Sequence, residues 1–262
     1  IYNSSYSGDG EGRIGNGWKL NLVQRIDTPI LPNKTTIDPR VKFVYTDGDG
    51  TKHYLVENNG AIVDEDGLGY TYNAIDETVD PGATPFKHQL TTKDKTVLKF
   101  DIWGYLRRII DVNGNTISLN YSPGPTGDKN HLTQIVTSSG GAMGLVYDSE
   151  FNLTSVVDNV GRVTTFSRTS GDVTKITYPD GTVTDFTYLN HRVTSVVSTG
   201  LGKCEYAYDA RGRVNSVKTY GTDNTLGSTL SFTYDCNQTK VTEADGRYLI
   251  YQFDSLGRVT CV

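Results

Sequence analysis

The chain has 262 residues and a formal net charge of −5, a length that suits one large β domain or two ordinary ones. Aromatic residues make up 10%, which excludes a disordered chain, and no run reaches the roughly 18 apolar residues of a membrane-spanning helix. Acidic and basic residues are evenly spread, so the basic patch expected of a nucleic-acid-binding protein is not found. The 28 glycines and 17 tyrosines favour short strands and turns over helices.

The first hundred residues predict strands separated by polar turns. Val41, Phe43 and Tyr45 alternate with other residues, as in a strand that has one buried face. A returning strand is expected to start at Tyr54, and a further strand is expected over residues 68–72. A hairpin is expected over residues 86–100. No Ser/Gly-rich linker divides the chain. We therefore expect residues 1–99 to be a β-rich lead-in region, continuous with the sheet that follows.

From residue 100 to residue 262 the sequence is periodic. One residue, tyrosine in most copies, marks each unit: Phe100, Tyr121, Tyr147, Ser167, Tyr188, Tyr208, Tyr234 and Phe253. The steps between markers are 19 to 26 residues, which is the length of two strands and two turns. Apolar residues two and four positions before most markers predict one buried face. A β-propeller is the alternative fold, but its blades need about 40–50 residues each.

A second strand follows each marker after a turn of recurring sequence. The fullest copy covers residues 208–214, where Tyr208-Asp209 is followed by Gly212-Arg213, and residues 253–259 repeat it. An aspartate accepts a hydrogen bond from the backbone two residues on, and glycine allows the positive φ that closes the turn. We expect Arg213 and Arg258 to pair with the aspartate four residues earlier or to lie over the row of tyrosines.

This pattern resembles the YD-repeat (Rhs) family, named for its Tyr-Asp dipeptide followed by Gly-Arg. The copies depart from it at Ser167-Arg168, which replaces the dipeptide, and at Phe151-Asn152, which stands in the place of Gly-Arg. The opening residues resemble the N-terminal part of secreted bacterial YD-repeat proteins. The resemblance implies an all-β fold in which consecutive antiparallel β-hairpins form a long curved sheet, an open fragment of a β-shell. Residues 100–262 would supply about seven units, truncated at the C-terminal end.

The resemblance also implies a structural, encapsulating role in a large secreted or cell-surface protein. In bacterial toxins of this family the shell encloses a toxic domain, and in teneurins it is part of an adhesion receptor. The expected partners are a downstream effector or further repeats of the parent chain. The alternative is an adhesion module that binds glycans or a partner surface, and a carbohydrate-active enzyme ranks third.

No catalytic, cofactor-binding or metal-binding residues are predicted. The acidic stretches at residues 47–50 and 64–67 lack the ligand spacing of an EF-hand and are interpreted as hairpin turns. The four histidines are scattered without metal-ligand spacing, and each is expected on a wet strand face or in a turn: His53, His88, His131 and His191. We therefore predict a protein that is not an enzyme and needs no cofactor.

Trp103 and Trp18 are the candidate glycan contacts. Trp103 lies in a predicted turn, where an exposed indole can stack on a sugar ring. The alternative, which we favour, is that each indole covers a neighbouring hairpin, the commoner fate of a large apolar ring. The three cysteines do not suggest a disulfide framework, and Cys204 in the apolar row is expected to be a small buried hydrophobe.

Overall fold

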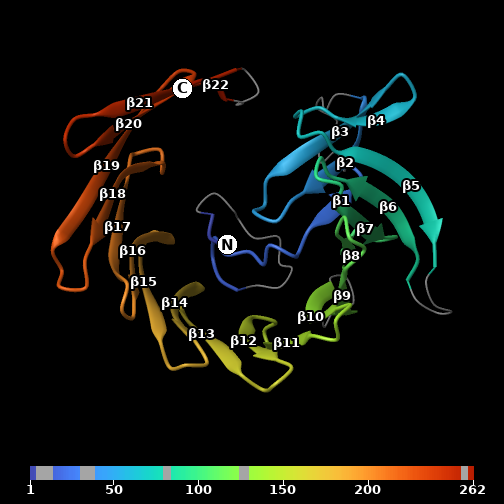
Figure 1. Cartoon of the computed structure of the whole chain (residues 1–262), viewed down its shortest axis with the longest axis horizontal. Coiled ribbons are helices and arrows are strands. Elements are labelled where there is room, and N and C mark those ends of the chain that lie inside the picture. Colours follow the sequence, from blue (N-terminus) through green and yellow to red (C-terminus); the bar gives the residue numbers. More distant parts are fainter. Residues whose placement is uncertain (4–13, 30–38, 79–83, 124–129, 255–258) are drawn as a thin grey trace. The chain divides into compact units, whose positions relative to one another are not determined.

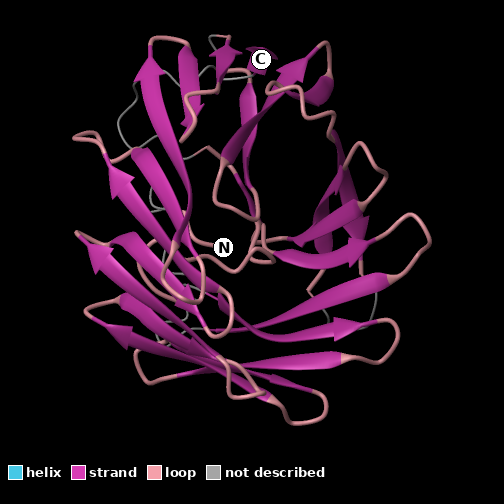
Figure 2. Ribbon diagram, turned by 60° about the vertical axis from the view of Figure 1, so that its left-hand side comes forward, coloured by secondary structure: helices cyan, strands magenta, loops and turns pink. Residues whose placement is uncertain are grey.

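The computed structural model describes residues 1–3, 14–29, 39–78, 84–123, 130–254 and 259–262. Every regular element within these ranges is a β-strand, and 22 strands are assigned to one sheet (Figure 2). Pairing is antiparallel throughout, so the predicted all-β fold of consecutive hairpins is confirmed. The chain forms two compact units, residues 1–163 and 164–262. The predicted division between residues 99 and 100 concerns the sequence repeats and stays a prediction.

The strands of the first unit, labelled in Figure 1, are β1 (Arg25–Asp27), β2 (Val41–Thr46), β3 (Lys52–Asn58), β4 (Ala61–Asp64), β5 (Thr71–Glu77), β6 (Phe86–Thr91), β7 (Val97–Asp101), β8 (Leu106–Ile110), β9 (Thr116–Pro123), β10 (Asn130–Thr137), β11 (Ala142–Tyr147) and β12 (Leu153–Asp158). Each pairs with the next along the chain. The sequence interpretation missed the short strand β4 and placed the alternation of β3 one residue off. Leu55 is buried there, whereas Tyr54 is 40% exposed.

The first unit closes on itself through β1. One side of β1 pairs with β2, and the other side meets the turn before β8. There the N–H of Ile26 donates to the carbonyl of Gly104 at 2.9 Å, and the N–H of Leu106 donates to that of Gln24 at 3.1 Å. Strands β1 to β8 therefore form a closed ring.

The core of the first unit lies inside this ring. Tyr45 on β2 reaches across to Phe100 on β7, with ring centroids 6.0 Å apart, and these side chains are 2% and 0% exposed. Of the 20 buried hydrophobic side chains in the described part of the chain, 17 belong to the first unit. Ring closure explains the part of this core that lies on β1 to β8, because it gives the apolar faces of these strands one another to pack against. Four of the buried side chains lie outside the ring, on β9 to β12: Leu119, Leu132, Leu145 and Leu153.

The strands of the second unit follow one another from yellow to red in Figure 1: β13 (Val163–Thr169), which begins at the unit boundary, β14 (Asp172–Thr177), β15 (Val183–Leu189), β16 (Arg192–Ser198), β17 (Gly202–Tyr208), β18 (Val214–Tyr220), β19 (Leu226–Asp235), β20 (Gln238–Glu243), β21 (Tyr248–Phe253) and β22 (Val259–Cys261). Each pairs with the next. This unit holds three of the buried hydrophobic side chains, Val173, Ile176 and Val193. Its predicted apolar row is only half-buried, as at Phe186 and Cys204.

A tyrosine hydroxyl ties each of four repeats to the repeat before it. The hydroxyl of Tyr208 donates to the carbonyl of Val193 at 2.7 Å, 15 residues earlier in the chain. The same bond recurs from Tyr147 to Leu132, from Tyr188 to Val173 and from Tyr234 to Val214. These marker tyrosines are half-buried and not fully in the core, because each hydroxyl must reach a backbone carbonyl.

In several repeats the Leu or Val paired with the marker is deeply buried. Leu153 opposes Tyr147 and Val193 opposes Tyr188, and they are 0% and 4% exposed. A register shift at the marker accompanies both pairs, and the extra residue lies on the strand that follows the marker, Thr154 in β12 and Thr194 in β16.

One marker was assigned wrongly from the sequence. The register shift in β13 falls between Ser167 and Arg168, and Arg168 opposes the buried Val173. Arg168, and not Ser167, therefore occupies the tyrosine position of this repeat. The correction places the half-buried Phe166 two residues before the marker, as in the other copies, and leaves Thr165 exposed.

Gly104 is predicted to be essential for ring closure. A Cβ on this residue would lie 1.9 Å from the carbonyl oxygen of Ile26, and its φ is +82°. Gly114 has φ +84° in an equivalent turn but open space around it. Gly114→Ala should cost the left-handed penalty of about 1–2 kcal/mol. Gly104→Ala should cost about 1–3 kcal/mol more, because the clash adds to that penalty. Urea unfolding of both variants measures the difference, and equal losses would contradict closure through β1.

Removal of the Tyr208 hydroxyl tests the link between repeats. Tyr208→Phe should lower the free energy of unfolding by about 1 kcal/mol, because the Val193 carbonyl loses its hydroxyl donor. Tyr178 lies in a turn of the same unit and is 40% exposed, so Tyr178→Phe is the matched control with a change within about 0.5 kcal/mol. If both variants unfolded at the same urea concentration, the hydroxyl bond of Tyr208 would make no contribution to the free energy of unfolding.

Candidate functional site

The turns that follow the markers Phe100, Tyr147 and Tyr208 are each built on one aspartate. Oδ1 of Asp209 accepts the N–H groups of Arg211 and Arg213, both at 2.9 Å, and Gly212 has φ +79°. Equivalent paired bonds are made by Asp101, Asp111, Asp148 and Asp158. The predicted Asp-Gly turn is thus confirmed. These carboxylates are committed to the backbone, which makes them poor candidates for acid–base chemistry.

Arg213 makes both contacts that the sequence suggested as alternatives. Its Nε donates to Oδ2 of Asp209 at 2.8 Å, and its guanidinium lies 4.2 Å from the ring centroid of Tyr234. Arg258, for which the same contacts were predicted, lies outside the described residues. Where Gly-Arg is replaced, Phe151 takes up the positive φ of +61° and the Asn152 amide donates to Asp148 in place of arginine. The Phe151 ring packs on His131, 5.0 Å between centroids.

The acidic stretches at residues 47–50 and 64–67 form turns, as predicted. Oδ1 of Asp47 accepts the N–H of Thr51 at 3.0 Å, and Oδ1 of Asp64 accepts the N–H of Asp66 at 3.0 Å. The two turns are joined by His53. This interaction was not apparent from the sequence.

His53 is buried between two carboxylates and not on a wet strand face, so that prediction was wrong. Its Nε2 lies 3.0 Å from Oδ2 of Asp47 and its Nδ1 lies 2.9 Å from Oδ2 of Asp66, and the residue is 7% exposed. Burial alone would lower the pKa of His53, but the hydrogen bonds to the two carboxylates outweigh it and raise the pKa. A protonated imidazole donates to both carboxylates, whereas a neutral one donates to one only.

The groups around His53 make this cluster polar on several sides. The rings of Tyr45 and Tyr70 lie 5.8 and 6.4 Å from the imidazole, and Nζ of the buried Lys19 donates to the carbonyl of Asp47 at 2.7 Å. Burial, followed by the neighbouring phenol and carboxylates, raises the pKa of Tyr45 well above its usual range. These contacts brace the turns of the first unit.

Trp103 lines a cleft in the first unit. The cleft has a volume of about 550 Å³, and its lining includes Trp103, Tyr105, Tyr121, Arg25 and Arg107. Trp103 is 57% exposed, so its indole does not cover a neighbouring hairpin. The rings of Tyr105 and Tyr121 are tilted against each other with centroids 5.2 Å apart. The predicted turn position of Trp103 is confirmed, and its contact with a glycan remains a prediction.

Trp18 is placed differently. It is half-buried, bridges Tyr2 through the backbone, and packs its ring against that tyrosine with centroids 5.6 Å apart. This is the covering role that the sequence favoured. The structure does not bring Trp18 into the cleft lined by Trp103.

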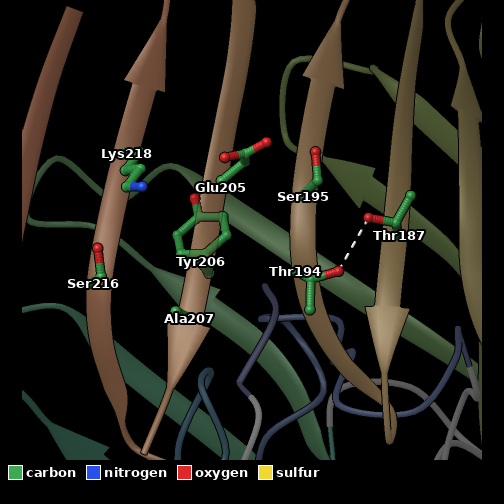
Figure 3. Close-up of a pocket in the computed structure, with 8 residues that line it drawn as sticks. All are labelled: Thr187, Thr194, Ser195, Glu205, Tyr206, Ala207, Ser216 and Lys218. Carbon is green, nitrogen blue, oxygen red and sulfur yellow. Dashed lines mark hydrogen bonds between the residues drawn. The ribbon is translucent and has the colours of Figure 1, made fainter. Parts of the chain in front are cut away.

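A shallow hollow in the second unit is polar. Figure 3 shows threonine hydroxyls on neighbouring strands facing each other, and Oγ1 of Thr187 lies 3.1 Å from that of Thr194. Glu205, on the next strand along, pairs with Lys203 at 2.8 Å and accepts from the hydroxyl of Tyr220 at 2.7 Å. These two contacts lower the pKa of Glu205, which makes it a poor general acid. The hollow therefore offers hydrogen bonds but no paired acid and base.

Comparison with known proteins agrees with the repeat geometry. The RHS repeat family model matches residues 147–183 and 169–203, the region in which the Asp turns and the tyrosine-to-carbonyl bonds recur. Residues 147–203 of the chain are therefore YD (RHS) repeats. No curated protein matches it. Within the described residues, no helix is long and apolar enough to cross a membrane.

Solved structures similar to this YD-repeat chain include three crystal structures of TcdB2-TccC3 assemblies. The complex with Cdc42 is 13% identical with a TM-score of 0.38 over 84% of this chain, and the form without the hypervariable C-terminal region is also 13% identical, with a TM-score of 0.39. The TcdB2-TccC3 structure itself gives the same identity and a TM-score of 0.39 over 83%. The chain spans 12% of the length of each of them.

The His53 bridge predicts a pH dependence of stability. Because the folded-state pKa is raised, the stabilisation is fully present below the unfolded value of about 6.5 and is lost as pH rises through the higher folded value. His53→Gln should therefore unfold more easily than the wild type at pH 6, by roughly 2 kcal/mol, the scale of one hydrogen bond to a charged group.

Urea unfolding of both proteins between pH 5.5 and 9 should show this difference shrinking as pH rises. Burial lowers the pKa of His88, partly opposed by Asp101, and burial lowers that of His131, so both act in the opposite direction. They are common to both proteins and cancel in the difference. Parallel profiles for wild type and variant would show that His53 does not act through its proton.

Proposed function

We propose that this YD-repeat chain is a structural module that builds a rigid β-sheet wall for a large secreted or cell-surface protein. The observation that carries the proposal is the repeating link of tyrosine hydroxyl to the carbonyl of the preceding repeat, seen from Tyr147 to Tyr234. Each link depends only on neighbours, so repeats add in series in the way that repeat proteins extend. Further repeats or an effector of the parent chain are the proposed partners.

The site chemistry supports a role without catalysis. The aspartates that recur from repeat to repeat accept backbone N–H groups, and Glu205 in the second-unit hollow is held ionised by Lys203 and Tyr220. A catalytic pair needs two groups whose environments separate their protonation states around a reacting atom. We expect the pure chain to hydrolyse neither glycosides nor peptides. Turnover that a single side-chain substitution abolishes would overturn this part of the proposal.

Limited proteolysis of the parent protein tests the structural role. In-frame deletion of residues 164–262 should make the remaining chain more sensitive to protease, because the neighbouring repeat loses the strand that pairs with it. Val112 is 71% exposed in a turn, and Val112→Ser in the intact parent is the control with an unchanged digestion pattern. If the deletion leaves the digestion of the remaining chain unchanged, the module does not act as a wall.

A second function, binding of saccharides, is favoured by the cleft beside Trp103. Its volume of about 550 Å³ falls within the range of small-molecule sites, and an exposed indole in its lining offers a flat apolar face. Sugar rings present C–H groups that pack on such a face. This role is compatible with the wall, since the cleft occupies a small part of the first unit.

A further inference from the structure

The segment between β4 and β5, residues 65–70, is only weakly joined to the sheet. β4 and β5 share a single paired position, Val63 opposite Thr71, whereas β2 and β3 share five. Gly67 and Gly69 within the segment have φ +74° and +78°. Few ladder bonds and two flexible glycines allow the segment to move while the neighbouring strands stay in place.

Residues 65–70 cover the buried cluster around His53. Oδ2 of Asp66 lies 2.9 Å from Nδ1 of His53. The ring of Tyr70 meets that of Tyr45 edge to face, with centroids 5.6 Å apart. His53 is 7% exposed and Tyr45 is 2% exposed. Displacement of the segment would therefore open the cluster to solvent.

The two carboxylates that His53 bridges are held unequally. Oδ1 of Asp47 also accepts the N–H groups of Asp49 and Thr51, at 3.1 and 3.0 Å, which fixes this carboxylate in the turn after β2. Within the described part of the chain, the Asp66 carboxylate hydrogen-bonds His53 alone. An imidazole that loses its proton keeps one N–H and presents a lone pair to the other carboxylate. The better-held Asp47 retains the N–H, so the lone pair faces Asp66.

Other titratable and charged groups surround this bridge. They are Tyr45 on β2, Asp47 and Asp49 in the turn after it, Asp64 at the end of β4, Asp66 and Tyr70 in the segment, Asp94 in the turn after β6, and Lys19 in the N-terminal segment. Burial raises the pKa of both tyrosines, so the phenols stay neutral between pH 6 and pH 9. Burial lowers the pKa of the amino group of Ile1, but that group donates to the carbonyl of Lys19 and is the same in every variant. His53 is therefore the member of the cluster that changes charge near neutral pH.

We propose that residues 65–70 form a lid over the His53 cluster, closed while a charged His53 bridges Asp47 and Asp66 and released when that charge is lost. Because contact with the carboxylates raises the pKa of His53, closure is favoured at low pH and is lost as pH rises through the raised pKa. The movement is local, since the pairing of β2 with β3 and of β5 with β6 does not involve the lid. The fold thereby contains an acid-closed cover over Tyr45 and the interior of the ring.

Hydrogen exchange of the 262-residue chain at pH 6 and pH 9 tests the lid, with each rate corrected for the intrinsic effect of pH. The N–H groups of Glu65 and Gly69 report on it, because they donate to the Tyr54 carbonyl and to Oδ2 of Asp64. Protection of residues 65–70 should fall by about tenfold or more at pH 9, the effect of losing one hydrogen bond to a charged group. Equal protection at the two pH values overturns the proposal.

Two regions of the same chain serve as internal controls. The turn at residues 111–115 is built on Asp111 and contains no histidine, so its protection should be the same at both pH values. Strand β7, residues 97–101, should stay protected throughout, because the ring remains closed. A loss of protection at β7 as large as that of the lid would show general unfolding and would overturn a local movement.

Two substitutions should fix the lid in one position each. His53→Gln carries an uncharged amide that donates to one carboxylate, so protection of residues 65–70 should be low at both pH values. Asp66→Asn keeps the contact in both states, because its Oδ1 accepts from the charged imidazole and its Nδ2 donates to the neutral one. Its lid should therefore stay protected at pH 9. If Asp66→Asn loses protection with pH as the wild type does, the proposal fails, and this result does not depend on whether His53→Gln folds.

Discussion

Three of the markers are followed by an aspartate that accepts two backbone N–H groups, from the residues two and four positions further along. The bonds from Asp209 to Arg211 and Arg213 fix the turn, and the glycine between them supplies the positive φ. Once such a turn is fixed, the second strand starts at a defined residue and its Leu or Val falls opposite the marker. In these repeats the carboxylate therefore helps to set the register of the hairpin.

The two units are built from the same kind of hairpin, but their strands are buried to different extents. In the first unit β1 closes the ring, so that Tyr45, Leu55 and Phe100 are almost fully buried. In the second unit the corresponding faces are half-buried, and the hydroxyl bonds of Tyr188, Tyr208 and Tyr234 become a larger share of what holds neighbouring repeats together. Polar links suit such a sheet, because a half-exposed apolar face alone contributes less than a closed core.

The two candidate sites follow from ring closure as well. His53 is buried because it lies on the same face of β3 as the buried Leu55, and its two carboxylates come from turns at the ends of different hairpins. The Trp103 cleft exists because β1 crosses the turn after β7 and brings Arg25 beside the indole. Both sites combine residues that are more than ten positions apart in the sequence. Neither site could therefore be recognised from the spacing of its residues.

The sequence by itself determined the features that depend on near neighbours. Alternation with period two gave the strands, the Asp-x-x-Gly pattern gave the turns, and the pairing of Arg213 with Asp209 followed from a separation of four residues. The wrong marker at Ser167 arose because an arginine at position 168 carries no aromatic signal, and only the pairing with Val173 identifies it as the marker. The depth of burial could not be predicted either, since it depends on whether another layer covers the strand. Only the tertiary structure decided the closure through Gly104, the bridge at His53 and the cleft beside Trp103, because each requires segments that are distant in the chain to meet.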